Sequence, residues 1–203
     1  MTAVQFDQFW LSRFPHTPPI SHYFRHDYGD KWFRIHSLPE SKRYANTEAE
    51  WETLLTRQNA VITDVLGLDT SILLVTGDYL YDELSAEEVD FTLDSVLTLE
   101  SIAGLPFEPA TRTDLHRMDP EEYDSGRIYQ PFFCEQIWRP HQFDAVLKDI
   151  ADDCTRVLFI ALERECIAVP YDGGVDLFLP TAEARDTYRT KYQAWLSSRE
   201  DGL

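Results

Sequence analysis

Apolar residues recur at steps of three and four in four segments of the chain, which is the spacing of one helix face. These segments run from Thr2 to Arg13, from Thr47 to Leu66, from Phe143 to Ile150 and from Thr181 to Leu196. Thr2 with Gln5 and Thr47 with Glu50 have the spacing of a capping box, and Thr181 is suited to cap the last segment. We therefore predict four helices.

The stripe that we expect the last helix to bury is aromatic. It consists of Ala184, Tyr188, Tyr192, Trp195 and Leu196. These positions fall on one face at helical spacing, which favours packing against the rest of the chain.

Six other segments have the composition and length of strands. They cover residues 31–37, 71–76, 127–138, 156–162, 166–171 and 175–179. Residues 71–76 and 156–162 are continuous apolar runs, typical of strands covered on both faces. Pro131 has no backbone donor and so indicates an edge position or a bulge. Asp172-Gly173-Gly174 favours the positive φ angles of a tight turn, so we expect the last two strands to pair antiparallel.

Residues 82–124 have a mixed pattern, from which we expect one strand and much loop. The order of elements along the chain lacks the regular strand-helix alternation of a doubly wound sheet. It predicts an α+β fold with a single mixed or antiparallel sheet packed against about four helices. Neither a repeat nor a flexible linker divides residues 1–203, so one domain is the simplest organisation.

The charge of the chain is unusual: 18 Lys and Arg against 36 Asp and Glu give −18 in 203 residues. Because phosphate contacts supply most of the affinity for nucleic acid, we do not expect a nucleic-acid partner. Residues 82–124 hold 13 acidic side chains and two arginines. This density predicts a docking face for a cationic protein, and the alternative is an acidic loop that serves only solubility.

The three cysteines, Cys134, Cys154 and Cys166, include no CxxC pair, so neither a disulfide framework nor a thiolate zinc site is indicated. We interpret them as small core residues. No segment approaches the ~20 apolar residues of a transmembrane helix, and the N-terminal residues do not resemble a signal peptide. We therefore expect a cytoplasmic protein without a membrane partner.

No catalytic signature is present: GxSxG, GxxxxGK[ST], GxGxxG and HExxH are all absent. This favours a protein that is not an enzyme, and we expect no cofactor. Four histidines, His16, His22, His26 and His36, lie close together in sequence, but their spacing fits no named zinc motif. We therefore predict surface or hydrogen-bonded imidazoles rather than a metal site.

Residues 170–200 resemble the C-terminal module of a bacterial family that is known only as a domain of unknown function and is described as Rossmann-like. The similarity lies in Tyr171-Asp172, in Val175-Asp176-Leu177, and in a helix that carries Tyr188, Tyr192 and Trp195. This family-like hairpin and helix cover about residues 166–199. The family has no established activity, so the resemblance implies a fold and assigns no catalytic residue. Many members have arginine where this chain has Gly173, which argues against a functional turn.

A short basic stretch interrupts the acidic chain. Residues 22–43 contain five basic and three acidic side chains. Arg34, His36, Lys42 and Arg43 supply donors suited to an anion, so we predict that they form a binding site. The alternative is that these cations pair with the protein's own carboxylates.

Two functions are compatible with these features. The first is a non-enzymatic binding protein, for example an immunity-like protein that docks a basic partner on its acidic face. The alternative is a small-molecule-binding protein or enzyme that acts on an anionic ligand.

Overall fold

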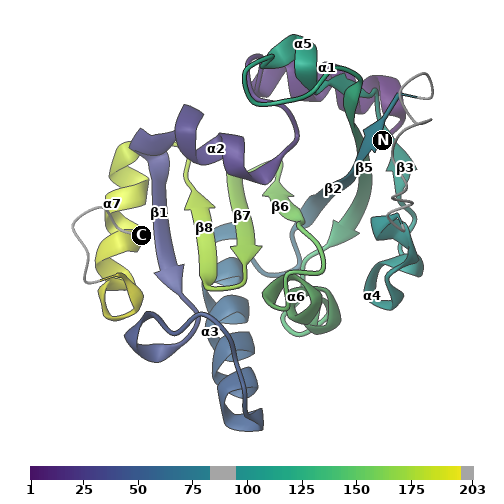
Figure 1. Ribbon diagram of the computed structural model, residues 1–203. Helices are drawn as coiled ribbons and strands as arrows, with labels where there is room; N and C mark the ends of the chain where they lie inside the picture. Colours follow the sequence, from purple (N-terminus) through teal and green to yellow (C-terminus); the bar gives the residue numbers. More distant parts are fainter. Residues whose placement is uncertain (83–94, 198–203) are drawn as a thin grey trace. The chain divides into compact units, whose positions relative to one another are not determined.

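The computed structural model describes residues 1–82 and 95–197. It contains an open eight-stranded antiparallel sheet and seven α-helices among these residues, which confirms the predicted α+β class (Figure 1). The helices are α1 (Ala3–Arg13), α2 (Ser21–Asp27), α3 (Glu48–Leu66), α4 (Glu100–Ala103), α5 (Leu115–Met118), α6 (Asp144–Ala151) and α7 (Ala182–Lys191). The strands are β1 (Trp32–His36), β2 (Ser71–Tyr81), β3 (Glu108–Pro109), β4 (Thr113–Asp114), β5 (Arg127–Ile137), β6 (Leu158–Ala161), β7 (Cys166–Tyr171) and β8 (Gly174–Phe178).

The strands follow the order β1-β8-β7-β6-β2-β5-β3, and β4 also pairs with β5. The chain divides into two compact units. The first consists of residues 1–20 and 75–134, and the second of residues 21–74 and 135–203.

The four predicted helices are present as α1, α3, α6 and α7. The hydroxyl of Thr2 accepts a hydrogen bond from the backbone N–H of Gln5 at 3.4 Å, and the Thr2 N–H donates to the Gln5 side chain at 2.8 Å. Thr47 and Thr181 likewise cap α3 and α7. The structure adds three short helices, α2, α4 and α5, whose seven, four and four residues are too few to show a period.

The second unit is built around β1, β8, β7 and β6. Apolar side chains on one face of these strands lie on α3, which contacts both β7 and β8. This face includes Phe33, Ile35, Val175 and Leu177, all at most 3% exposed. Helix α7 lies beside β1 at the end of the sheet (Figure 1). These contacts bury the apolar face of the strands and leave their other face for the polar residues described below.

The first unit contains α1 and the ends of β2 and β5. Phe6 of α1 stacks on Phe133 of β5 with ring centroids 4.5 Å apart. Pro131 is not on an edge strand, because β5 pairs with β3 and β4 on one side. The pairing with β5 is interrupted between the end of β3 and the start of β4. In this gap the Pro131 carbonyl accepts a hydrogen bond from the Ala110 N–H at 2.9 Å. The proline therefore lies where the ladder is broken, as in the predicted bulge.

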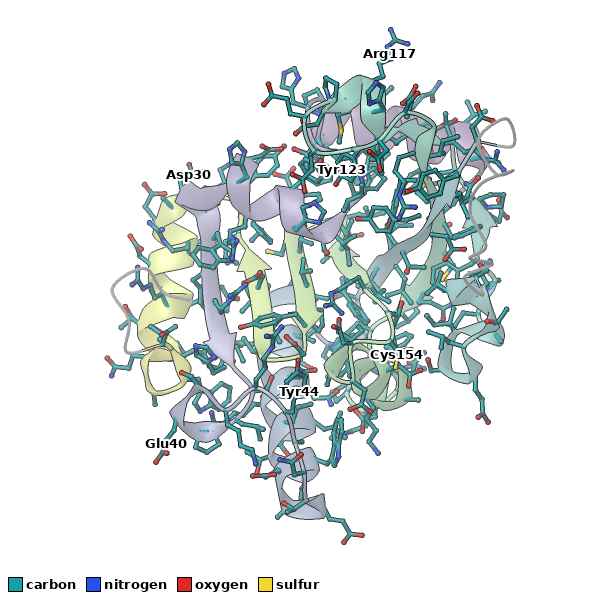
Figure 2. The ribbon with its side chains drawn as sticks, in the orientation of Figure 1. Asp30, Glu40, Tyr44, Arg117, Tyr123 and Cys154 are labelled. Carbon is teal, nitrogen blue, oxygen red and sulfur yellow. The ribbon has the colours of Figure 1, made fainter. Side chains whose placement is uncertain are left out.

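Other expectations need correction. Neither Gly173 nor Gly174 has a positive φ, so the β7–β8 hairpin does not use the turn geometry that the Asp-Gly step favours. Helix α7 buries no residue fully, and of the predicted aromatic stripe only Tyr192 is buried, at 9% exposure. Cys154 is exposed after α6 rather than a core residue (Figure 2), whereas Cys134 and Cys166 are buried. Of residues 82–124, positions 83–94 lie outside the described residues; the remainder forms short helices and strands rather than one strand.

Across residues 1–82 and 95–197, no helix combines the length and the apolar character needed to cross a membrane.

Candidate functional site

One face of β1, β8 and β7 carries a group of polar side chains, and it is called here the polar face. Along β1 the side chains of Trp32, Arg34 and His36 point to the same face, because alternate residues of a strand share a face. The pairing of Arg34 with Asp176 on β8, and of Asp176 with Val169 on β7, continues this face across three strands. The residues that complete it include Tyr171 and Gly174, which are paired across the β7–β8 hairpin.

Arg34 and Asp176 form an ion pair in the middle of this face. The Arg34 Nε donates to Asp176 Oδ1 at 2.7 Å, and Nη2 donates to Oδ2 at 2.8 Å. The Trp32 indole N–H donates to the same Oδ1 at 2.9 Å. Both charged side chains are largely buried, with 13% and 14% of their areas exposed. Burial lowers the pKa of Arg34, but the hydrogen bonds to Asp176 and the charge of that carboxylate together outweigh it and leave the pKa raised, so the guanidinium stays charged.

The Arg34 guanidinium also lies over the ring of Tyr171, with its central carbon 4.2 Å from the ring centroid. Burial raises the pKa of the Tyr171 hydroxyl, which therefore remains protonated and available as a donor at neutral pH. Arg34 and Tyr171 together form a rigid floor on the polar face.

A second ion pair lies at the β7–β8 turn. The Asp172 carboxylate is almost completely buried and accepts a hydrogen bond from Arg43 Nε, while the Arg43 side chain is 63% exposed. The Tyr44 hydroxyl also hydrogen-bonds to Asp172, which raises the pKa of Tyr44. Figure 2 shows Tyr44 on the segment after β1, at the end of the sheet where the β7–β8 turn lies. Asp172 is therefore compensated by groups from a segment more than a hundred residues away in sequence.

The structure brings together three of the four predicted site residues. Arg34, His36 and Arg43 line one pocket, whereas Lys42 pairs with Glu50 at the start of α3 and does not line it. Arg34, Lys42 and Arg43 each pair with a carboxylate, which is the alternative that the sequence left open. Their binding of an external anion remains a prediction.

His36 differs from these cations because it has no partner. The side chain is buried, with 7% of the residue exposed, and neither ring nitrogen has a hydrogen-bond partner among the described residues. Burial and the nearby charge of Arg34 lower the pKa of His36, while the backbone of Gly173 raises it. The lowering of the pKa prevails, so the imidazole is neutral at pH 7. Both ring nitrogens are also shielded from solvent.

The pocket next to His36, called here the arginine pocket, has a volume of about 510 Å³. It lies between α2, the end of β1 and the β7–β8 hairpin. Its lining consists of Ser21, His22, Arg25, Arg34, His36, Ser41, Arg43, Arg156, Val169, Pro170, Tyr171, Asp172, Gly173 and Asp176. Four arginines and two aspartates make the lining net positive by two charges, in a chain of −18.

Arg25 on α2 is the lining arginine without a partner. Its side chain is exposed, and it forms neither an ion pair nor a hydrogen bond with any residue in 1–82 or 95–197. Arg156 pairs with Asp153, but both side chains are about half exposed, which makes this pair weak. Arg25 is therefore the lining arginine whose charge no described carboxylate balances.

Sequence reasoning missed Arg25, Tyr171, Asp172 and Asp176 as parts of a site. The last two were assigned only to a turn and a strand. The available signal was alternation: Tyr171, Gly174 and Asp176 occupy one face of the hairpin, as Arg34 and His36 do on β1. No local sequence pattern shows that this face of the hairpin and this face of β1 lie on the same side of the sheet.

The other cavities are less promising as ligand sites. A pocket of about 810 Å³ between α3 and α6 is lined mainly by acidic and apolar residues, and its His141 and Asp144 bond to each other at 2.9 Å. A third pocket, in the first unit, is mostly apolar. Within the described parts of the chain, no group of three or more His, Cys, Asp or Glu residues is placed to hold a metal ion.

The fold and the site together define the class of protein: it is an α+β protein with an open antiparallel sheet and a basic pocket on the polar face of that sheet. The family model for a domain of unknown function, DUF3885, matches residues 20–200, so the chain belongs to this family. The match includes every residue that lines the arginine pocket. No curated protein and no solved structure matches the chain. A Rossmann-like description is not confirmed, because the sheet is antiparallel.

Proposed function

We propose that this protein is a binding protein whose arginine pocket takes a small anionic ligand. The observation that carries the proposal is Arg25, an exposed arginine in the lining of a net positive pocket that pairs with no described residue.

The unbalanced positive charge of the pocket indicates that its ligand is negatively charged. Arg34 and Arg43 are balanced by Asp176 and Asp172, whereas Arg25 is not balanced by any described residue. A planar guanidinium with free donors recognises carboxylate and phosphate oxygens in pairs. The ion-paired arginines hold the pocket in shape, and Arg25 is the cation available to the ligand.

The size of the cavity is also appropriate. Pockets that bind metabolites and similar molecules have volumes of about 300–1,000 Å³. The arginine pocket, at about 510 Å³, lies in this range and is wider than one inorganic anion requires.

Thermal melting with anions tests this proposal. Inorganic phosphate, citrate, nucleotides and phosphorylated sugars would be added separately, and an anion at 100 times its Kd is expected to stabilise the protein by about 2.7 kcal/mol. Arg25→Gln should weaken binding by roughly 10- to 100-fold, because a hydrogen bond to a charged group is lost, and should leave unliganded stability unchanged. Arg139→Gln is the matched control, since Arg139 pairs with Asp69 away from the pocket. If no anion shifts the melting temperature, the proposal is wrong.

A second candidate function is the docking of a cationic protein on the acidic segment, residues 82–124. In the first unit Asp114, Glu121, Glu122 and Asp124 are exposed, and none forms an ion pair with a described residue. Such unpaired charge speeds and selects association with a positive surface. Five of the 13 acidic residues in 82–124 lie in 83–94, outside the described residues.

Affinity capture with a charge-reversed variant tests this candidate. A triple change of Glu121, Glu122 and Asp124 to lysine should abolish the capture of a basic protein that the parent retains at low salt. Raising the salt concentration should weaken the parent's binding in the same way, because exposed charges are screened. Capture that is indifferent both to the triple change and to salt would count against an acidic docking face.

A further inference from the structure

The mostly apolar cavity of the first unit, called here the apolar pocket, also has the size of a ligand site. Its volume is about 480 Å³, within the range of about 300–1,000 Å³ that is common for small-molecule sites. Residues 6–19, from α1 and the chain that follows it, form most of the lining, and residues 111–113, Met118 and Pro131 complete it. All of them belong to the first unit. Residues 6–19 precede the region that the family model matches, so the family match does not contain this pocket.

Large apolar side chains make up much of the lining of the apolar pocket. Phe6 and Trp10 are almost completely buried, whereas Leu11 and Met118 are 66% and 37% exposed. A ligand that covers exposed apolar side chains removes their surface from water, which favours binding. The Trp10 indole N–H donates to the Thr17 carbonyl at 2.7 Å, so the ring offers a ligand its apolar surface and not a free donor. Most of the lining therefore suits an apolar body.

Arg112 is a lining cation that a neutral group holds in place. Its Nε donates to Oε1 of Gln130 at 2.9 Å, and Gln130 is buried, with 7% of the residue exposed. The Gln130 amide nitrogen donates in turn to the carbonyls of Ala110 and Pro131 at 2.9 and 3.0 Å, which fixes the amide. The terminal nitrogens of Arg112, Nη1 and Nη2, form no ion pair or hydrogen bond with any residue in 1–82 or 95–197. The guanidinium is therefore oriented, and no described acid balances its charge.

Asp7, the acidic residue among the described lining residues, already has donors. The Thr111 hydroxyl donates to Asp7 Oδ2 at 2.6 Å, and the Thr111 N–H donates to Oδ1 at 3.4 Å. Both oxygens of Asp7 are thus engaged, whereas Arg112 has donors for which the described residues supply no acceptor. A carboxylate is the acceptor group that a guanidinium binds through two parallel hydrogen bonds. The charge of Asp7 disfavours a ligand with two negative charges, such as a phosphomonoester.

We infer that the apolar pocket binds a small amphipathic carboxylate, a molecule with an apolar aliphatic or aromatic body and one carboxylate. The body contacts the apolar lining, which includes Trp10, Leu11 and Phe14, and the carboxylate accepts hydrogen bonds from the terminal nitrogens of Arg112. This site is separate from the one in the proposed function, because no described residue lines both the apolar pocket and the arginine pocket. The inference therefore stands or falls independently of the proposed function.

Isothermal titration calorimetry with matched ligands tests this inference. The probes are octanoate and 3-phenylpropionate, which have both parts, and acetate, octan-1-ol and octyl phosphate, which each change one of them. We expect the better of the first two to bind at least about tenfold more tightly than acetate, because acetate lacks the apolar body. Octanoate should also bind at least about tenfold more tightly than octan-1-ol, which lacks the charge, and more tightly than octyl phosphate, which carries a second one.

Two pairs of variants assign the contributions. Arg112→Gln should reduce the preference for octanoate over octan-1-ol to less than about threefold and keep the binding of octan-1-ol. Arg117→Gln is its control, because Arg117 is exposed, does not line the pocket and extends away from α5 (Figure 2). Leu11→Ser should weaken octanoate and octan-1-ol alike, by at least about threefold. Leu68→Ser is its control, since Leu68 is 63% exposed and belongs to the second unit. All four side chains are exposed, so the variants should fold.

Several results would overturn the inference. If octan-1-ol binds as tightly as octanoate, or if Arg112→Gln leaves their ratio unchanged, the pocket does not recognise a carboxylate. If Arg25→Gln abolishes the binding of octanoate and Arg112→Gln does not, the carboxylate binds in the arginine pocket instead. If neither octanoate nor 3-phenylpropionate binds, and Leu11→Ser but not Leu68→Ser dissociates a dimer in sedimentation velocity, a second copy of the chain covers the apolar pocket. Absence of binding without such a dimer equally refutes the inference, and in both cases the proposed function is untouched.

Discussion

Replacing Gly174 by alanine is expected to lower the free energy of unfolding by about 3 kcal/mol or more, because the new methyl group has no space. A Cβ atom at Gly174 would lie 1.9 Å from the carbonyl oxygen of Ile35. That oxygen belongs to the backbone of β1, so only a separation of β1 from β8 can relieve the clash. The same Cβ would lie 3.1 Å from the Tyr171 hydroxyl, so the floor of the pocket should shift as well.

Urea unfolding followed by tryptophan fluorescence measures this loss, and Gly29→Ala is the matched control. Gly29 is in the same unit, does not require a positive φ, and a Cβ there meets nothing within 4 Å. Its replacement should change the free energy of unfolding by no more than about 0.5 kcal/mol. Equal midpoints for the two variants and the parent would show that β1 and β8 do not approach each other so closely.

Asp176→Ala is expected to cost about 3–5 kcal/mol, because it leaves the buried charge of Arg34 without compensation. Asp176 accepts three hydrogen bonds, two from Arg34 and one from Trp32, at 2.7–2.9 Å. Both members of the ion pair are more than four-fifths buried, so solvent cannot take over the role of the carboxylate. The variant should therefore lose far more stability than the removal of an exposed ion pair does.

Two comparisons make this prediction specific. Asp69→Ala breaks an ion pair whose side chains are both more than 60% exposed, and it should cost less than about 1 kcal/mol. The double variant Arg34→Met with Asp176→Leu removes both buried charges and should recover most of the stability lost by Asp176→Ala. If the double variant is no more stable than the single one, the loss comes from packing and not from an uncompensated charge.

These two predictions also bear on the binding proposals. A buried ion pair and a close approach of β1 and β8 hold Arg34, Tyr171 and the hairpin in fixed positions. A site that is rigid before the ligand arrives loses less entropy on binding. Arg25 is exposed and has no partner among the described residues, so it is the position where binding can be changed without loss of the fold.

The helices that the sequence predicted correctly are those with local signals. Thr2, Thr47 and Thr181 each accept a hydrogen bond from a backbone N–H three residues later, so the information for the helix start lies within four residues. The apolar period of residues 48–66 then extends over 19 residues of α3. Helix α2 was missed because its seven residues are too few to show a period.

The β7–β8 hairpin gives a mixed result. Its existence and its antiparallel pairing follow from two apolar runs separated by a short turn, and both are confirmed. The reason given for its glycines is wrong, since neither adopts a positive φ. Gly174 is required by the neighbouring strand β1, which is far away in sequence, and no turn rule contains that information.

For this protein the sequence alone determined the α+β class, the starts of the main helices, the last hairpin and the basic character of residues 22–43, because each of these depends on residues close together in the chain. Only the tertiary structure decided which cations remain free. Arg34 meets Asp176 across 142 positions of sequence and Arg43 meets Asp172 across 129, whereas Arg25 meets no described acid and His36 no described partner. The physical reason is strand register: pairing Arg34 opposite Asp176 puts both on the polar face, and a shift of one residue would turn Asp176 into the core.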